Sequence, residues 1–234
     1  MKRPVVAIDG PAGAGKSTVA RLVAERLGYV LLDTGALYRT VALAAERAGV
    51  PWDDADAVSA YAEKLARERA VQLGRAPDGT LRSLLSGEDV SGSIRTLSIG
   101  QGASKVSAVP GVRAALLALQ RNAGEGGGVV LEGRDIGTVV FPDAEVKVFL
   151  TASVEVRARR RFEELVGRGE RPEMERVREE VIERDQRDST RAVAPLKQAP
   201  DAIVLYSSAL EVSDVVGQIV ERVRVAERLL AGQA

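Results

Sequence analysis

A glycine-rich stretch near the start of the chain, IDGPAGAGKST over residues 8–18, has residue types and spacing suited to phosphate chemistry. Gly10, Gly15, Lys16 and Ser17 fit the pattern G-x-x-x-x-G-K-[ST]. Glycines let main-chain N–H groups approach phosphate oxygens, and the helix that follows such a loop adds positive potential. An ordinary strand-to-helix turn is the other interpretation, but the agreement of motif and context favours a phosphate-binding loop.

The motif also predicts what the polar side chains of this loop would do. Lys16 would reach the β- and γ-phosphates of a bound nucleotide, and Ser17 would ligate Mg²⁺. Asp33 or Glu132 are further candidates that would act on the ion through water. The loop residues that would surround the phosphates are Gly10, Pro11, Ala12, Gly13, Ala14, Gly15, Lys16, Ser17 and Thr18.

The composition excludes several other chemistries. The chain of 234 residues has neither cysteine nor histidine, so disulfides, thiolate zinc sites and serine–histidine nucleophile systems are ruled out. Phosphoryl transfer fits the remaining inventory, because it depends mainly on positioning and charge stabilisation. The 33 basic and 33 acidic residues balance, which argues against a polyanion binder that relies on net charge.

Two polar patches follow apolar runs. LLDTGALYR at 31–39 supplies Asp33, Thr34 and Arg39, and EGRDIGT at 132–138 supplies Glu132, Arg134 and Asp135. Ligands of open α/β sheets bind at the carboxyl ends of strands, which is where both patches would lie. A solvated loop with helix caps is the alternative for either patch.

A third patch, ERDQRDSTRAVAPL at 183–196, is rich in charge. On a helix, Arg184, Arg187, Asp188 and Arg191 would fall within roughly 100° of arc. Guanidiniums gathered on one face indicate an anionic ligand, and phosphates of two nucleotides would serve. A solvated face with i,i+4 pairs such as Arg184–Asp188 is the alternative.

The elements that must position these groups alternate between strand and helix. Apolar runs without alternation predict buried parallel strands at 5–8, 29–32, 128–132, 146–150 and 202–206. Helical periodicity follows the first run up to Gly28, follows the second up to Gly49, and spans about 110–124. A last helix closes the chain, with Ser213 expected as its N-cap. The pattern predicts an α/β fold with a parallel sheet.

Two regions interrupt this alternation. Residues 51–109 are too long for one crossover, and the turn signal APDG at 76–79 lies between two possible strands, which predicts a small antiparallel insertion. Residues 151–195 are dense in charge and predict two exposed helices joined by GRGERP at 167–172.

Taken together, five blocks resemble the bacterial cytidylate kinase family of nucleoside monophosphate kinases. They occur in the family's order over about residues 5–205 and are IDGPAGAGKST, LLDTGALYR, EDVSGSIRT, EGRDIGTVVFPDA and RDQRDSTRAVAPL. The resemblance implies a P-loop nucleoside monophosphate kinase fold: a five-stranded parallel sheet flanked by helices, a monophosphate-binding insertion and a short lid. The implied domains are a core of 1–50, 110–150 and 192–234, an insertion of 51–109, and a lid with flanking helices at 151–191.

The resemblance also implies roles for individual residues. The loop from Gly10 to Thr18 would hold the phosphates of ATP. Arg39 and Arg134 would hold the phosphate of CMP, while Ser104, Arg113 and Asp135 would read cytosine and Asp188 the ribose. The full expected CMP set is Thr34, Arg39, Ser104, Arg113, Arg134, Asp135 and Asp188, and the expected catalytic set is Lys16, Arg134, Arg184 and Arg191. Without the resemblance, Arg113 would read equally as a surface arginine with a snorkelling stem. The segment 167–175 carries no family motif, so the adenine contacts are unassigned.

The expected function is ATP-dependent phosphorylation of CMP and dCMP, a transferase reaction of pyrimidine metabolism with Mg²⁺ as cofactor. Cytosine offers an amino donor where uracil offers an acceptor, so the Asp135 carboxylate suits cytosine. Alternatives are a kinase of UMP or of another small acceptor, or a nucleotide-sensing module without turnover. A GTPase is excluded, because Asn122, the single asparagine, is not in an N-K-x-D motif. We expect a cytoplasmic monomer that binds ATP and CMP or dCMP, without nucleic-acid or membrane partners.

Overall fold

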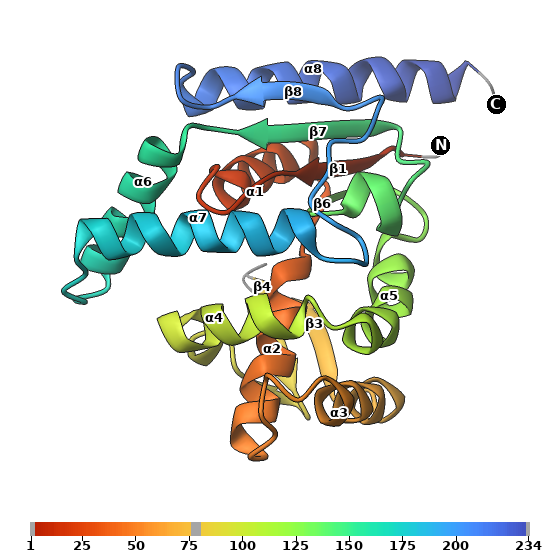
Figure 1. Cartoon of the computed structure of the whole chain (residues 1–234). Helices are drawn as coiled ribbons and strands as arrows, with labels where there is room; N and C mark the ends of the chain where they lie inside the picture. The colour runs from red at the N-terminus through yellow and green to blue at the C-terminus, as the bar shows by residue number, and fades with distance from the viewer. Residues whose placement is uncertain (1–2, 76–80, 233–234) are drawn as a thin grey trace. The chain divides into compact units, whose positions relative to one another are not determined.

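Five short apolar runs form the strands of one parallel sheet in the computed structural model, which describes residues 3–75 and 81–232. The spatial order is β2-β6-β1-β7-β8. The strands are β1 (Val5–Asp9), β2 (Val30–Asp33), β6 (Val129–Gly133), β7 (Val146–Thr151) and β8 (Ile203–Tyr206) (Figure 1). All five predicted strands are confirmed, with ends displaced by at most one residue.

The chain divides into two compact units. The first consists of Met1–Leu31 with Gly126–Ala234, and the second consists of Leu32–Glu125. In the first unit, a core of valine, leucine, isoleucine and alanine side chains joins the sheet to two helices. These helices are α1 (Lys16–Leu27) and α8 (Val212–Ala231).

The ends of these helices show how local sequence shapes them. Gly28, at φ +63°, is the C-cap of α1, as predicted, because glycine adopts this left-handed conformation without steric cost. The expected N-cap of the last helix is wrong: α8 begins at Val212 after Glu211, and Ser213 lies inside its first turn. An N-cap at Ser213 would place the first helical residue at position 214, but the helix begins two residues earlier.

Two further helices of the first unit, α6 (Val154–Gly167) and α7 (Met174–Thr190), pack side by side (Figure 1). The predicted helices and their junction are confirmed, but the expectation that both are exposed is only partly right. α6 buries Arg157, Ala158 and Leu165, and α7 buries Val177, Val181 and Asp188. Each helix therefore turns one face inward, and two of the residues on those faces are charged.

The second unit has its own core. Its helices are α2 (Thr34–Arg47), α3 (Ala55–Arg67), α4 (Leu97–Val106) and α5 (Pro110–Gly124), with a 3₁₀ turn at Ser93–Arg95. The predicted antiparallel insertion is present as β3 (Val71–Arg75), β4 (Leu81–Leu85) and β5 (Glu88–Asp89). The APDG turn signal lies outside the described residues.

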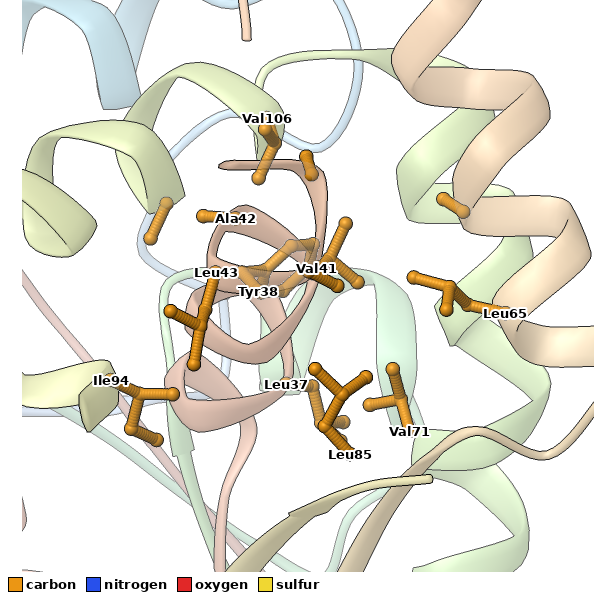
Figure 2. Packing of buried hydrophobic residues seen from close by; sticks show 14 of the residues in the cluster. Leu37, Tyr38, Val41, Ala42, Leu43, Leu65, Val71, Leu85, Ile94 and Val106 are labelled. Atoms are coloured by element: carbon orange, nitrogen blue, oxygen red, sulfur yellow. The ribbon is translucent and has the colours of Figure 1, made fainter. Parts of the chain in front are cut away.

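Figure 2 shows how α2 fills the centre of this second core, with Leu37 and Val41 among apolar side chains of neighbouring elements. Leu37 is 1% exposed and Val41 is fully buried. α2 ends at Arg47, two residues before the predicted stop at Gly49, which adopts φ +68° in the turn that follows. Within the described ranges, no helix is long and apolar enough to cross a membrane.

Candidate active site

The glycine loop links the end of β1 to the start of α1, as its motif predicts. Gly10, Gly13 and Gly15 adopt φ values of +151°, +74° and +90°, a region that favours glycine. At Gly10 a Cβ atom would lie 1.9 Å from the carbonyl oxygen of Leu150 on β7, so no other residue fits there. The loop therefore bends tightly against the sheet and places the N-terminus of α1 at its carboxyl edge, which is an anion-binding arrangement.

Lys16 is the first residue of α1 and is 6% exposed. Its Nζ donates to the carbonyl oxygen of Pro11 over 2.8 Å, which folds the side chain back along the loop. Burial, and then the positive charge of Arg134, lower the pKa of Lys16 to about 7. A phosphate anion beside Nζ would favour the charged form, because an opposite charge stabilises it.

Two other carbonyl groups of the loop are held from elements distant in the sequence. Arg157 on α6 donates from Nη1 to Ala12 over 3.1 Å, and its Nη2 pairs with Asp185 on α7 at 2.6 Å. Ser207, just after β8, donates from Oγ to the carbonyl of Ala14 over 3.0 Å. These contacts satisfy the carbonyl groups of the loop from the protein side, which helps to hold its backbone in one conformation.

Arg160 on α6 supports Ser207. Its Nη1 donates to Ser207 Oγ over 2.9 Å, its Nη2 donates to the Ser207 carbonyl over 2.8 Å, and Nη1 also lies 3.4 Å from the Ala14 carbonyl. Sequence reasoning missed Arg157, Arg160 and Ser207 as parts of the site. No local signal distinguishes Arg157 and Arg160 from the exposed Arg159 between them.

Ser17, in the first turn of α1, contacts Glu132, near the carboxyl end of β6. Ser17 Oγ donates to Glu132 Oε2 over 2.9 Å, and Glu132 is 5% exposed. Among the described residues no group of three histidine, cysteine, aspartate or glutamate side chains could hold a metal. A hydroxyl and one nearby carboxylate nevertheless suit Mg²⁺, which retains waters and takes substrate phosphates as ligands.

Arg134 and Asp188 form a buried ion pair between the loop after β6 and the last turn of α7. Arg134 Nε donates to Asp188 Oδ2 over 2.8 Å, and their side chains are 18% and 5% exposed. Burial would raise the pKa of Asp188, but the charges of Arg134 and Arg184 outweigh it and hold this pKa below its ordinary value. Burial likewise opposes the charge on Arg134, yet the Asp188 carboxylate keeps the pKa of Arg134 raised.

A second buried pair lies beside the first. Arg191, the C-cap residue of α7, donates from Nη2 to Asp135 Oδ1 over 3.2 Å, and its Nε donates to the carbonyl of Ala194 over 2.6 Å. The side chains of Arg191 and Asp135 are 4% and 6% exposed. The structure thus brings Arg134, Asp135, Asp188 and Arg191 together, with carboxylates of the protein compensating two of the guanidiniums.

The other residues predicted to bind CMP belong to the second unit. Arg39 on α2 donates from Nη1 to the carbonyl of Ile94 over 3.2 Å, and the Gly100 backbone on α4 leaves room for this guanidinium. Ser104, one turn further along α4, is 3% exposed. Thr34, the first residue of α2, is 4% exposed, while Asp33 accepts from the Ala36 N–H and so caps the same helix.

Arg113 on α5 is buried, so the alternative of a surface arginine is wrong. The residue is 7% exposed, its Nη1 donates to the carbonyl of Ser107 over 3.2 Å, and its guanidinium lies 5.4 Å from the centroid of the Tyr38 ring. An arginine held between a carbonyl and an aromatic face has a defined direction, which is what a recognition group needs.

The chain has the features of a P-loop kinase. A parallel sheet carries a glycine loop between β1 and α1, and Lys16, Arg134 and Arg191 lie on the same unit of the chain. The cytidylate kinase family model matches residues 6–225. The chain therefore belongs to the cytidylate kinase family.

Curated relatives agree with the family match. A cytidylate kinase of Pelotomaculum thermopropionicum is 51% identical over 225 residues, covering 96% of this chain and 98% of the relative. One from Geobacter sp. (strain M21) is 52% identical over 229 residues, covering 97% and 95%. Among solved structures, an uncharacterized protein from Eubacterium ventriosum has a TM-score of 0.52 at 13% identity, covering 95% of this chain and 99% of that one, which is a likeness of fold alone.

Proposed function

We propose that this protein transfers the γ-phosphoryl group of ATP to CMP or dCMP, forming ADP and CDP or dCDP. The observation that carries the proposal is membership of the cytidylate kinase family. The glycine loop between β1 and α1, with Lys16 buried at the start of α1, supports it. The same phosphate group leaves ATP and arrives on CMP, so the reaction needs no further reactant.

The glycine loop is proposed to bind the phosphates of ATP. Its residues Gly10 to Thr18 would present main-chain N–H groups and the α1 N-terminus to the oxygens. Lys16 would move from the Pro11 carbonyl to the phosphates when they arrive. The carbonyl contacts from Arg157 and Ser207 support this role, because they hold the loop before ATP binds.

Mg²⁺ is proposed as the cofactor, with Ser17 as its protein ligand and Glu132 or Asp33 acting through water. The Ser17–Glu132 contact supports a ligand set of oxygen atoms. When bound, the ion would supply positive charge to the β- and γ-phosphates.

Two groups of residues are proposed to bind CMP. Arg134, Asp135 and Asp188 form the first, and Thr34, Arg39, Ser104 and Arg113 form the second. The burial of Asp135 and of Arg113 supports a role in recognition, since a buried polar group that contacts the substrate penalises a base with which it cannot pair. Asp135 would accept from the cytosine amino group and Asp188 from the sugar.

Lys16, Arg134, Arg184 and Arg191 are proposed to stabilise the charge of the phosphoryl group during transfer. No proton-transfer residue is needed, because the phosphate of CMP is already anionic and the transition state of phosphoryl transfer is loose. Exclusion of water from the site would favour transfer over hydrolysis of ATP.

The finer functional organisation is part of the same proposal. Residues 1–50, 110–150 and 192–234 would serve as the core, 51–109 as the monophosphate-binding insertion, and 151–191 as the lid with its flanking helices. We further propose that the protein acts as a monomer in the cytoplasm, on nucleotides rather than on nucleic acid or membranes.

A coupled assay of ADP release tests the proposal. Purified protein with Mg·ATP is offered CMP, dCMP, UMP, AMP and GMP in turn, and ADP formation is followed. We expect turnover with CMP and dCMP well above that with the other three. ADP formation with none of them would overturn the enzyme proposal and leave a nucleotide-sensing module.

A further inference from the structure

Asp9 is a buried carboxylate that the proposed reaction does not use. It is the last residue of β1, lies directly before Gly10 of the phosphate loop, and is 5% exposed. Its Oδ1 accepts from the Ile136 N–H over 2.8 Å, and its Oδ2 accepts from the Gly137 N–H over 2.8 Å. Both carboxylate oxygens thus accept from the main chain of one turn, which follows the neighbouring strand β6.

That turn, Ile136–Val140, is a π-helical turn, and its first N–H groups lack partners within the turn itself. Asp135, the residue before it, makes no side-chain cap and has φ −146° and ψ 24°. Its carbonyl accepts from the Val139 and Val140 N–H groups, so the turn closes on Asp135. Asp9 therefore does from β1 what an N-cap residue does from within its own chain segment.

The same turn directly follows two residues that are proposed to bind CMP. Arg134 and Asp135 immediately precede Ile136, and both are buried in ion pairs with Asp188 and Arg191. Strand β1 adjoins β6 in register, with Asp9 opposite Gly133. Asp9 therefore has two connections. Its main chain continues into the phosphate loop, and its side chain holds the turn that follows Arg134 and Asp135.

We propose that Asp9 is a positioning residue that holds the Arg134–Asp135 segment in the conformation that selects CMP. The expected effect on CMP kinetics rests on the proposed function, whereas the two hydrogen bonds that hold the turn do not depend on that function. The role requires a carboxylate, because two N–H donors need two acceptors. An amide of the same shape offers one acceptor and would place its NH₂ group against the other N–H.

The electrostatic surroundings show what the anchor must overcome. Burial, the largest influence, and the negative charge of Asp135 raise the pKa of Asp9, whereas the two main-chain hydrogen bonds and Lys16 lower it. The net result is a pKa of about 6. A carboxylate kept in this place despite its burial and a like charge nearby is held by the two N–H groups that it accepts from.

Asp9→Asn tests the proposal, measured above the Asp9 pKa so that the wild-type carboxylate is ionised. We expect KM for CMP to rise about tenfold or more, as for loss of a hydrogen bond to a charged group, and KM for ATP to change less than about threefold. The preference for CMP over UMP should fall as well. Equal changes in the two KM values, or an unchanged KM for CMP, would overturn the proposal.

Asp143→Asn is the matched control, because Asp143 is an exposed aspartate shortly after the same turn. It should leave both KM values and the base preference unchanged. If Asp9→Asn does not fold, Asp9→Ala is the second variant, because it removes both acceptors without placing an NH₂ group against an N–H. A KM for CMP unchanged in that variant would then overturn the proposal.

Amide hydrogen exchange separates this proposal from the proposed function. In Asp9→Asn the N–H groups of Ile136 and Gly137 should exchange faster, while amides in the middle of β1 and β6 keep their protection. This result is expected even if no nucleotide is phosphorylated, in which case only the enzyme proposal fails. Unchanged exchange at both positions would contradict the anchoring itself.

Discussion

Arg134 and Asp188 neutralise each other inside the first unit, across 54 positions of sequence. A buried ion pair that loses one member leaves the other charge without compensation, which costs about 3–5 kcal/mol. We therefore expect Asp188→Ala to lower the free energy of unfolding by about this amount, measured by urea denaturation. The double variant Arg134→Met/Asp188→Ala should recover part of the loss, and a double variant as unstable as the sum of the single ones would contradict the pair.

Asp188→Ala should also affect the two sugars differently. If its carboxylate contacts the ribose, kcat/KM for CMP and for dCMP should fall by different factors, because dCMP lacks one hydroxyl. The same ADP-release assay measures both. Equal losses would argue against a sugar contact and leave Asp188 with the ion pair alone.

Lys16→Met should reduce turnover by about 10²–10³-fold, as for loss of one preorganised group that binds developing charge. The variant should fold normally, because methionine keeps most of the buried volume and the substitution gives up a hydrogen bond to the Pro11 carbonyl. Near-normal turnover would exclude Lys16 from catalysis.

Binding of ATP should be linked to a proton at Lys16. In the protein without ATP, the pKa of Lys16 is lowered to about 7. About one pH unit above that value, most molecules therefore carry a neutral amine at this position. Phosphates raise this pKa, and ATP binding should therefore take up protons. Titration calorimetry in two buffers of different ionisation enthalpy measures the uptake. Lys16→Met should take up fewer protons, and equal uptake by both proteins would contradict the assignment.

Asp135→Ala should weaken the discrimination between CMP and UMP. Losing a carboxylate that accepts from the cytosine amino group should lower the ratio of the two kcat/KM values by about tenfold or more. The variant also removes the partner of Arg191, so its stability should be measured alongside. An unchanged ratio in a folded variant would remove Asp135 from base reading.

Ser207→Ala should raise KM for ATP by about fivefold, because the Ala14 carbonyl loses its hydroxyl donor and the loop is held less firmly. Ser207→Thr keeps a hydroxyl and should restore most of the affinity. KM for CMP should be unaffected in both. If alanine and threonine behave alike, the hydroxyl has no part in positioning the loop.

Arg160→Met tests the support of Ser207 from α6. It should raise KM for ATP, since Arg160 contacts both the hydroxyl and the carbonyl of Ser207. Arg159→Met is the matched control on the same helix, because Arg159 is exposed. A similar rise in both variants would point to a general loss of positive charge instead.

Features that depend on neighbouring residues could be predicted before the structure. The spacing of Gly10, Gly15 and Lys16 predicts the loop, and apolar runs predict all five strands, because backbone conformation and burial leave a local pattern. Gly28 is correctly predicted as a helix stop for the same reason. Ser213 shows the limit of local reasoning, because a cap-forming residue type does not decide where helical geometry begins.

The partners of the charged residues could not be predicted in this way. Asp9 meets Ile136 across 127 positions, and Ser207 meets Ala14 across 193. These pairs exist because the order β2-β6-β1-β7-β8 brings the ends of β1, β6 and β8 to one edge of the sheet. The sequence states which side chain stands at each position. A hydrogen bond, however, needs two atoms within about 3 Å of each other, and only the folded chain decides which atoms come that close.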